Sequence, residues 1–195
     1  MTAPLPPANL ATRTPRLLRL EPGDRLYRFY PRALDPIYFD HSIEGRLNAP
    51  DGSYGVLYAA AHPQGAFAET FLRTPGRQLI DPALMSRKAM VELEVLKPAR
   101  LIEFDGPGLA ILGATAEVVH GAPPYDTPQA WSKALEAHPI GSDGLAYGAR
   151  HDPHEVCYAI FERVSMRDVA RFEDLDADWF WEIADIYEMG RPPIP

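Results

Sequence analysis

Cysteine is almost absent from this sequence. Of the 195 residues, only Cys157 is a cysteine. A single thiol excludes an intrachain disulfide and a zinc site built from several thiolates. Cys157 lies in the apolar run Val156-Cys157-Tyr158-Ala159-Ile160, which favours a small buried side chain over a nucleophile. We therefore expect no chemistry from it.

Long hydrophobic runs are also missing. No segment approaches the ~18 apolar residues that a membrane-spanning helix needs. The first residues, MTAPLPPANLATRTPRLLRL, lack the continuous apolar stretch of a secretory signal. The sequence therefore predicts a soluble, cytoplasmic protein with no membrane partner.

Basic residues are in the minority. There are 19 lysines and arginines against 27 acidic residues, which gives a net charge of −8. Such a chain gains nothing from the release of counterions from a phosphate backbone, so we expect no direct nucleic-acid partner. A local group of arginines remains able to hold a small anionic ligand. Gly-rich phosphate loops are lacking too, and Gly106-Pro107-Gly108 is interpreted as a turn.

The pattern of elements predicts a single α+β domain. Residues 1–22, rich in proline and arginine, are expected to form an extended arm before a catalytic domain over residues 23–195. Hydrophobic alternation and short apolar runs predict strands at 56–60, 90–96, 101–105, 145–147 and 156–161. Helical spacing and start signals predict helices from Pro63 to about Arg73, from a Thr127 N-cap through Leu135, and over 176–188. In the last of these, the aromatic residues favour core packing over a partner interface.

Two arginines stand out in their local context. Arg46 lies between Gly45 and Asn48 ahead of a strand, where its planar guanidinium is able to grip phosphate oxygens with two hydrogen bonds. Arg28 lies between the aromatic residues Tyr27 and Phe29. The alternative is a solvated loop arginine for Arg46 and a surface arginine stacked on a ring for Arg28.

Glu69 has two interpretations. It precedes Arg73 by four residues, which is the spacing of an exposed helical ion pair. The other interpretation is a carboxylate at the rim of a cleft. When a glycosidic bond to a cationic leaving group breaks, positive charge builds on the ribose, and a fixed carboxylate stabilises that charge.

The order of these motifs resembles the RES domain over about residues 24–165. The resemblance is carried by Tyr27-Arg28, Gly45-Arg46-Leu47-Asn48, Val56-Leu57-Tyr58, Ala66-Phe67-Ala68-Glu69 and the stretch from Asp143 through Phe161. It implies a toxin that an Xre-type antitoxin neutralises, with homodimers expected. It also implies an ADP-ribosyltransferase-like fold, in which a split mixed or antiparallel sheet flanked by helices surrounds a cleft for NAD⁺.

The resemblance further implies that NAD⁺ is the substrate and that no metal takes part. The resemblance implies that the nicotinamide–ribose bond is cleaved and that ADP-ribose passes to phosphate or to a protein. By the same resemblance, Arg28 and Arg46 hold the pyrophosphate or ribose, Tyr58 packs on the nicotinamide side, and Glu69 supports the transition state. Catalytic roles thus fall on Glu69, Arg46 and Tyr58, and NAD⁺ contacts on Tyr27, Arg28, Arg46, Asn48, Tyr58, Ala149 and Arg150.

One departure from the family pattern concerns Ala149. The family serine falls two residues after the tyrosine of the late motif, where this chain has alanine. A lost hydrogen bond to a charged ligand costs on the order of 1.5–3 kcal/mol, although the neighbouring Arg150 is able to compensate. A catalytically weak or inactive binding protein is therefore one alternative function. A metal-dependent hydrolase using histidines such as His151 and His154 is another, but Asp152-Pro153 between them favours a turn.

Overall fold

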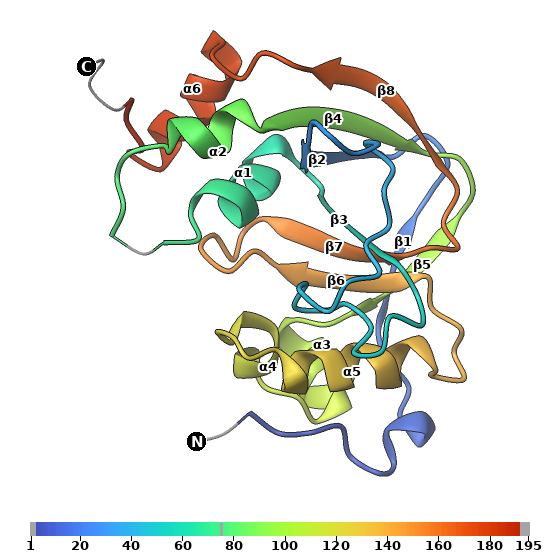
Figure 1. Ribbon diagram of the computed structural model, residues 1–195. Coiled ribbons are helices and arrows are strands. Elements are labelled where there is room, and N and C mark those ends of the chain that lie inside the picture. The colour runs from blue at the N-terminus through green and yellow to red at the C-terminus, as the bar shows by residue number, and fades with distance from the viewer. Residues whose placement is uncertain (1–2, 75, 192–195) are drawn as a thin grey trace.

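The computed structural model describes residues 3–74 and 76–191, which form one α+β unit (Figure 1). The strands are β1 (Leu17–Leu20), β2 (Arg25–Pro31), β3 (Val56–Ala60), β4 (Lys88–Val95), β5 (Ala99–Glu103), β6 (Gly144–Gly148), β7 (Val156–Phe161) and β8 (Met166–Phe172). The helices are α1 (Pro63–Phe71), α2 (Pro82–Ser86), α3 (Gly106–Leu112), α4 (Ala116–His120), α5 (Asp126–Glu136) and α6 (Asp178–Ile186), with a short 3₁₀ turn at Leu10–Thr12. The predicted α+β class is confirmed.

All eight strands belong to one mixed sheet in the order β1-β5-β6-β7-β3-β2-β4-β8. Only β5 and β6 run parallel, and the other neighbours are antiparallel. The register between β2 and β3 consists of a single pair, Tyr27 with Ala60. The sheet is therefore split at this junction, as the resemblance implied.

Both faces of the sheet are buried. Along β3, Val56 and Ala60 belong to one hydrophobic core, whereas Leu57 and Ala59 between them belong to a second. This alternation follows from the period of two along a strand. The second core also contains residues of both edge strands, for example Leu20 of β1 and Met166 of β8. Such a shared core indicates that the sheet is curled.

Helices gather at the two ends of the sheet (Figure 1). α1, α2 and α6 lie beside β2 and β4, and α3, α4 and α5 lie beyond β5 and β6. On α1, Phe67 and Phe71 stand four residues apart, and both pack against Phe180 of α6. Phe67 and Phe180 are fully buried, and burying such a ring contributes about 1.5–3 kcal/mol. The core interpretation of the last helix is therefore confirmed.

The predicted strands and helices are present, but some boundaries differ. α1 ends at Phe71, and the third predicted helix spans Asp178–Ile186. The helix predicted to start after a Thr127 cap begins earlier, at Asp126, with Tyr125 in the N-cap position. The reason is that a proline is tolerated throughout the first turn, so Pro128 did not fix the first residue.

Two segments differ from their predicted structures. Gly106-Pro107-Gly108 is not an isolated turn but opens α3, where the proline occupies the first turn. A β-carbon on Gly108 would collide with the Glu103 carbonyl, so glycine is required there. Within the predicted arm over residues 1–22, Leu17–Leu20 forms β1 and pairs with β5. Residues 1 and 2 of the predicted arm lie outside the described part of the chain.

In the described ranges, no helix is long and apolar enough to cross a membrane.

Candidate active site

A cavity of about 640 Å³ opens where β2 and β3 part. Its volume lies within the range of small-molecule sites, about 300–1,000 Å³. Most of the residues predicted to bind or act on NAD⁺ line it, namely Tyr27, Arg28, Arg46, Tyr58, Glu69 and Arg150. The split in the sheet thus brings together side chains from β2, β3, α1 and two loops.

Glu69 and Arg46 form the most constrained part of the cavity. Arg46 Nη2 lies 3.6 Å from Glu69 Oε2, and these side chains are only 14% and 20% exposed. The backbone N–H of Arg150 donates to Glu69 Oε1 at 2.9 Å. Arg46 Nη1 also donates to the Val119 carbonyl at 2.6 Å. Two partners therefore hold the carboxylate in one orientation.

The exposed ion pair proposed for Glu69 and Arg73 is wrong. Arg73 Nε donates to the backbone carbonyl of Glu69 at 2.7 Å, which leaves the carboxylate to Arg46 and Arg150. The solvated-loop interpretation of Arg46 is also wrong, because its side chain is largely buried. Burial lowers the pKa of Arg46, but nearby groups, including Tyr147 and Glu69, more than offset this effect, so its pKa is raised.

Asn48 supports the site from behind the cavity wall. It is fully buried and donates from Nδ2 to Asp40 Oδ2 at 3.0 Å and to the Ser42 carbonyl at 2.8 Å. Its Oδ1 accepts a 2.9 Å hydrogen bond from the Tyr58 hydroxyl, which itself accepts one from the Leu47 N–H at 2.7 Å. Asn48 thus fixes the loop that carries Arg46, but it does not line the cavity.

Tyr58 contributes a neutral ring to the wall. Burial raises the pKa of its hydroxyl above the ordinary value. Because the hydroxyl is bonded to Asn48 and to the Leu47 backbone, the ring is the part of Tyr58 that is left to face a ligand.

Arg28 lines the other side of the opening. Its Nη1 donates to the Pro36 and Tyr38 carbonyls at 3.3 and 3.2 Å. Its Nε is buried, and it has no hydrogen-bond partner among the described residues. Burial lowers the pKa of Arg28 to about 10, although the negative charge of Asp40 opposes the shift. The interpretation as a stacked surface arginine is therefore wrong.

Ala149 is placed away from the cavity. It is 1% exposed, and its N–H donates to the Glu155 carbonyl at 2.8 Å. The residue after it, Arg150, is the one that turns into the cavity and gives its backbone N–H to Glu69.

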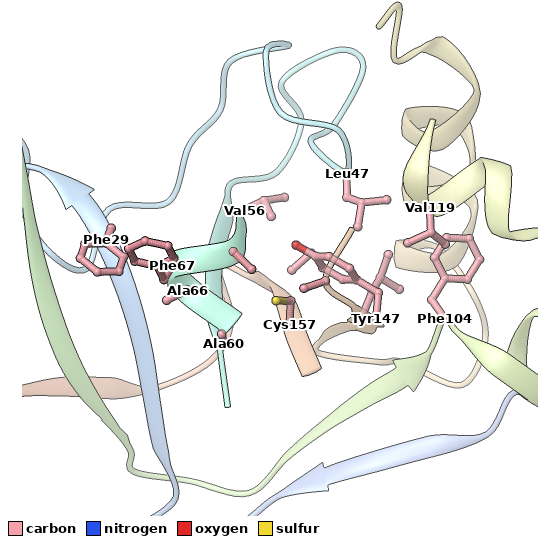
Figure 2. Close-up of a cluster of buried hydrophobic side chains, with 14 of the residues drawn as sticks. Phe29, Leu47, Val56, Ala60, Ala66, Phe67, Phe104, Val119, Tyr147 and Cys157 are labelled. Carbon is pink, nitrogen blue, oxygen red and sulfur yellow. The ribbon is translucent and has the colours of Figure 1, made fainter. Parts of the chain in front are cut away.

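Tyr147, Lys88, Arg73 and His151 also line the cavity, and sequence reasoning did not assign them to an NAD⁺ site. The Tyr147 ring lies between Cys157 and Phe104, with its hydroxyl directed away from Phe104 (Figure 2). Burial first, and then Glu69, raises the pKa of that hydroxyl. Its position in the late motif, directly before Gly148-Ala149-Arg150, was the available signal.

The sequence suggested a buried Cys157 and a turn between His151 and His154. Cys157 is buried, and burial raises the pKa of its thiol, which disfavours the reactive thiolate. His151 and His154 lie in a turn rather than on a helix. Burial, and next Arg150, lowers the pKa of His151. Within residues 3–74 and 76–191, no three or more His, Cys, Asp and Glu side chains are grouped to hold a metal ion.

A curled sheet, split at one strand pair and lined there by arginines and a glutamate, defines a small α+β domain built around a ligand cavity. The family model described as RES domain matches residues 16–180, and the chain belongs to this family.

The fold is similar to that in a crystal structure of the MbcT-MbcA toxin-antitoxin complex of M. tuberculosis. The TM-score is 0.67 at 14% sequence identity, and the match covers 86% of this chain and 92% of the other. No curated protein matches the sequence.

Proposed function

We propose that this protein is a RES-type toxin that binds NAD⁺ and cleaves its nicotinamide–ribose bond. The observation that carries the proposal is the anionic Glu69 carboxylate, fixed inside the cavity by Arg46 and the Arg150 N–H. A preorganised charge of this kind stabilises the opposite charge that develops in a transition state without further reorganisation.

In the proposed reaction, the bond between ribose C1′ and the nicotinamide nitrogen breaks. Both electrons leave with nicotinamide, which becomes neutral, and the ribose carries the positive charge that Glu69 stabilises. An acceptor oxygen, of phosphate or of a protein side chain, then bonds to C1′ and gives up its proton. The product is ADP-ribose attached to that acceptor.

The remaining side chains would hold the two ends of the substrate. Arg28 and Arg46 supply fork-shaped donors for the pyrophosphate or the ribose hydroxyls, and both line the cavity. Tyr27 and Tyr58 offer ring faces near Glu69 on which a flat nicotinamide can pack. No metal is required for these steps. Asn48 and Ala149 act in this proposal through their neighbours, Tyr58 and Arg150.

We further propose a protein antitoxin of the Xre type as the partner, with a homodimeric toxin acting in the cytoplasm. The support is family membership and the fold shared with a protein crystallised in a toxin-antitoxin complex. Copurification of the chain with the product of an adjacent reading frame would test the antitoxin assignment.

The decisive experiment is nicotinamide release from NAD⁺, with and without inorganic phosphate. Glu69→Gln keeps the shape of the side chain but removes its charge, and we expect turnover to fall roughly 10³-fold. Glu182→Gln is the matched control, because Glu182 is an exposed helical glutamate outside the cavity.

Phosphate-dependent release that requires Glu69 would establish an NAD⁺ phosphorylase, and phosphate-independent release would point to hydrolysis or to a protein acceptor. Folded wild-type protein that binds NAD⁺ but never releases nicotinamide would overturn the catalytic proposal. That result would favour the binding-only alternative that Ala149 raises.

A further inference from the structure

Basic side chains outnumber acidic ones in the cavity, although acidic residues predominate in the whole chain. Six basic and four acidic side chains line it, whereas the whole sequence has 19 basic and 27 acidic residues. Part of this excess belongs to Arg46 and Arg150 beside Glu69. The rest lies beside β2 and β4 and after α1.

Three of these cations lie close enough for their charges to interact, and all of them line the cavity. Lys88 is the first residue of β4 and pairs with Pro31 of β2, Arg28 lies three residues earlier on β2, and Arg73 follows α1. Burial lowers the pKa of Lys88, and the charges of Arg73, Arg28 and Arg87 lower it further. The ammonium group is therefore partly desolvated and surrounded by like charges.

These cations are not neutralised within the described residues. Neither Lys88, Arg28 nor Arg73 takes part in an ion pair there, in contrast to most of the other arginines. Two of the carboxylates that line the cavity have other partners. Asp81 lies 3.8 Å from Arg77 and caps α2, and Asp40 accepts from Asn48.

We propose that Lys88 and Arg73, together with the buried and unpartnered Nε of Arg28, form a subsite for a phosphate group. An anion here would pair with all three cations and relieve their mutual repulsion. The guanidinium of Arg73 offers a planar fork and Lys88 a compact point charge, a combination suited to phosphate oxygens.

The subsite deepens the proposed function, on which the identity of its ligand rests. Arg73 stands one helical turn beyond Glu69 and bonds its carbonyl, so the subsite lies close to the carboxylate that faces the reacting ribose. In the proposed reaction, two ligands bring a phosphate group close to this carboxylate. One is the pyrophosphate of NAD⁺, and the other is the inorganic phosphate that accepts ADP-ribose.

The test is Lys88→Met, which keeps the aliphatic stem and removes the charge. Lys97→Met is the matched control, since Lys97 is exposed in the turn after β4 and outside the cavity. Calorimetric titration with inorganic pyrophosphate and inorganic phosphate, and with NAD⁺ in proteins that also carry Glu69→Gln, measures binding without catalysis on variants whose melting temperature shows that they are folded. We expect Lys88→Met to weaken binding roughly 10- to 100-fold, with no change for Lys97→Met.

The ligands distinguish the two sources. Weaker binding of NAD⁺ and pyrophosphate, with phosphate unaffected, assigns the subsite to the dinucleotide, and the reverse assigns it to the acceptor. Unchanged affinity for all three in a folded Lys88→Met protein overturns the inference, even if the wild type releases nicotinamide. Wild type that binds pyrophosphate through Lys88 but releases no nicotinamide would retain the subsite and overturn the proposed function instead.

Discussion

The two sides of the cavity differ in whether their charged side chains are paired within the protein. On one side, the charged groups satisfy one another, because Glu69 is held by Arg46 and by the Arg150 backbone. On the other side, Lys88 and Arg73 line the cavity, and burial and next the charge of Arg73 lower the pKa of Lys88. Glu69 is thus paired within the protein, and we propose that an anion pairs with the cations of the other side.

This difference separates two tasks of a binding site. Groups that act on developing charge need a fixed orientation before the substrate arrives, and the bonds around Glu69 supply it. Groups that bind a charged ligand contribute more to its affinity when their charge is not already paired with a neighbouring group. Such charges reduce the stability of the empty protein, and a bound ligand restores it.

We expect the largest effect from Arg46→Ala, on the side of the cavity that holds Glu69. This change removes the cation beside Glu69 and the anchor to the Val119 carbonyl. We expect nicotinamide release to fall about 10²- to 10³-fold, the size typical for losing one preorganised electrostatic contact. Steady-state kinetics measures the effect. Undiminished turnover in a folded variant would sink the site assignment.

Tyr58→Phe removes a hydroxyl group that supports the same side of the cavity, and it changes no charge. The Asn48 Oδ1 and Leu47 N–H would lose their shared partner in a buried setting. We expect a loss of about 1–3 kcal/mol in the free energy of unfolding, because buried polar groups are left unsatisfied. Urea denaturation followed by tryptophan fluorescence measures it. An exposed control is Tyr38→Phe, and an equal loss there would contradict the argument.

The smallest effect concerns the contribution of Lys88 to stability in the protein without a bound anion. Because the folded-state pKa of Lys88 is lowered, the folded form binds its proton less tightly than the unfolded chain does. The charge therefore opposes folding at neutral pH, and stability is regained as pH rises through the lowered pKa of Lys88.

Lys88→Met should accordingly raise the free energy of unfolding by up to about 1 kcal/mol at neutral pH, a range set by partial exposure. The gain should shrink at alkaline pH. Thermal unfolding without phosphate measures both parts. A variant that is less stable than wild type at neutral pH would show that Lys88 is not opposed by its neighbours.

Much of the fold was predictable because its strands follow simple patterns. The alternation of Val91, Leu93 and Val95 with Glu92 and Glu94 places β4 correctly. The short helices α2, α3 and α4 were missed, since five to seven residues give too few turns for helical periodicity to show. β1 was missed because its pairing with β5 joins segments far apart in the sequence.

The site was predictable where residue type and order carry the signal. Arg46, Glu69 and Tyr58 follow the family motifs, and the structure brings them to one cavity. Lys88 and Arg73 carry no such signal, because only the pairing of β4 with β2 and the end of α1 bring them together. Local spacing even suggested the opposite role for Arg73, that of partner to the Glu69 carboxylate.

The single residue pair between β2 and β3 has a consequence for how a ligand is recognised. Two neighbouring strands would normally exchange main-chain hydrogen bonds along their whole length, but here only Tyr27 and Ala60 are paired. Beyond that pair, residues of both strands line the cavity. A ligand in the opening can thus use amide donors and carbonyl acceptors that a continuous sheet would consume internally. Side-chain substitution cannot remove this contribution, so some affinity should persist in every variant that keeps the strands apart.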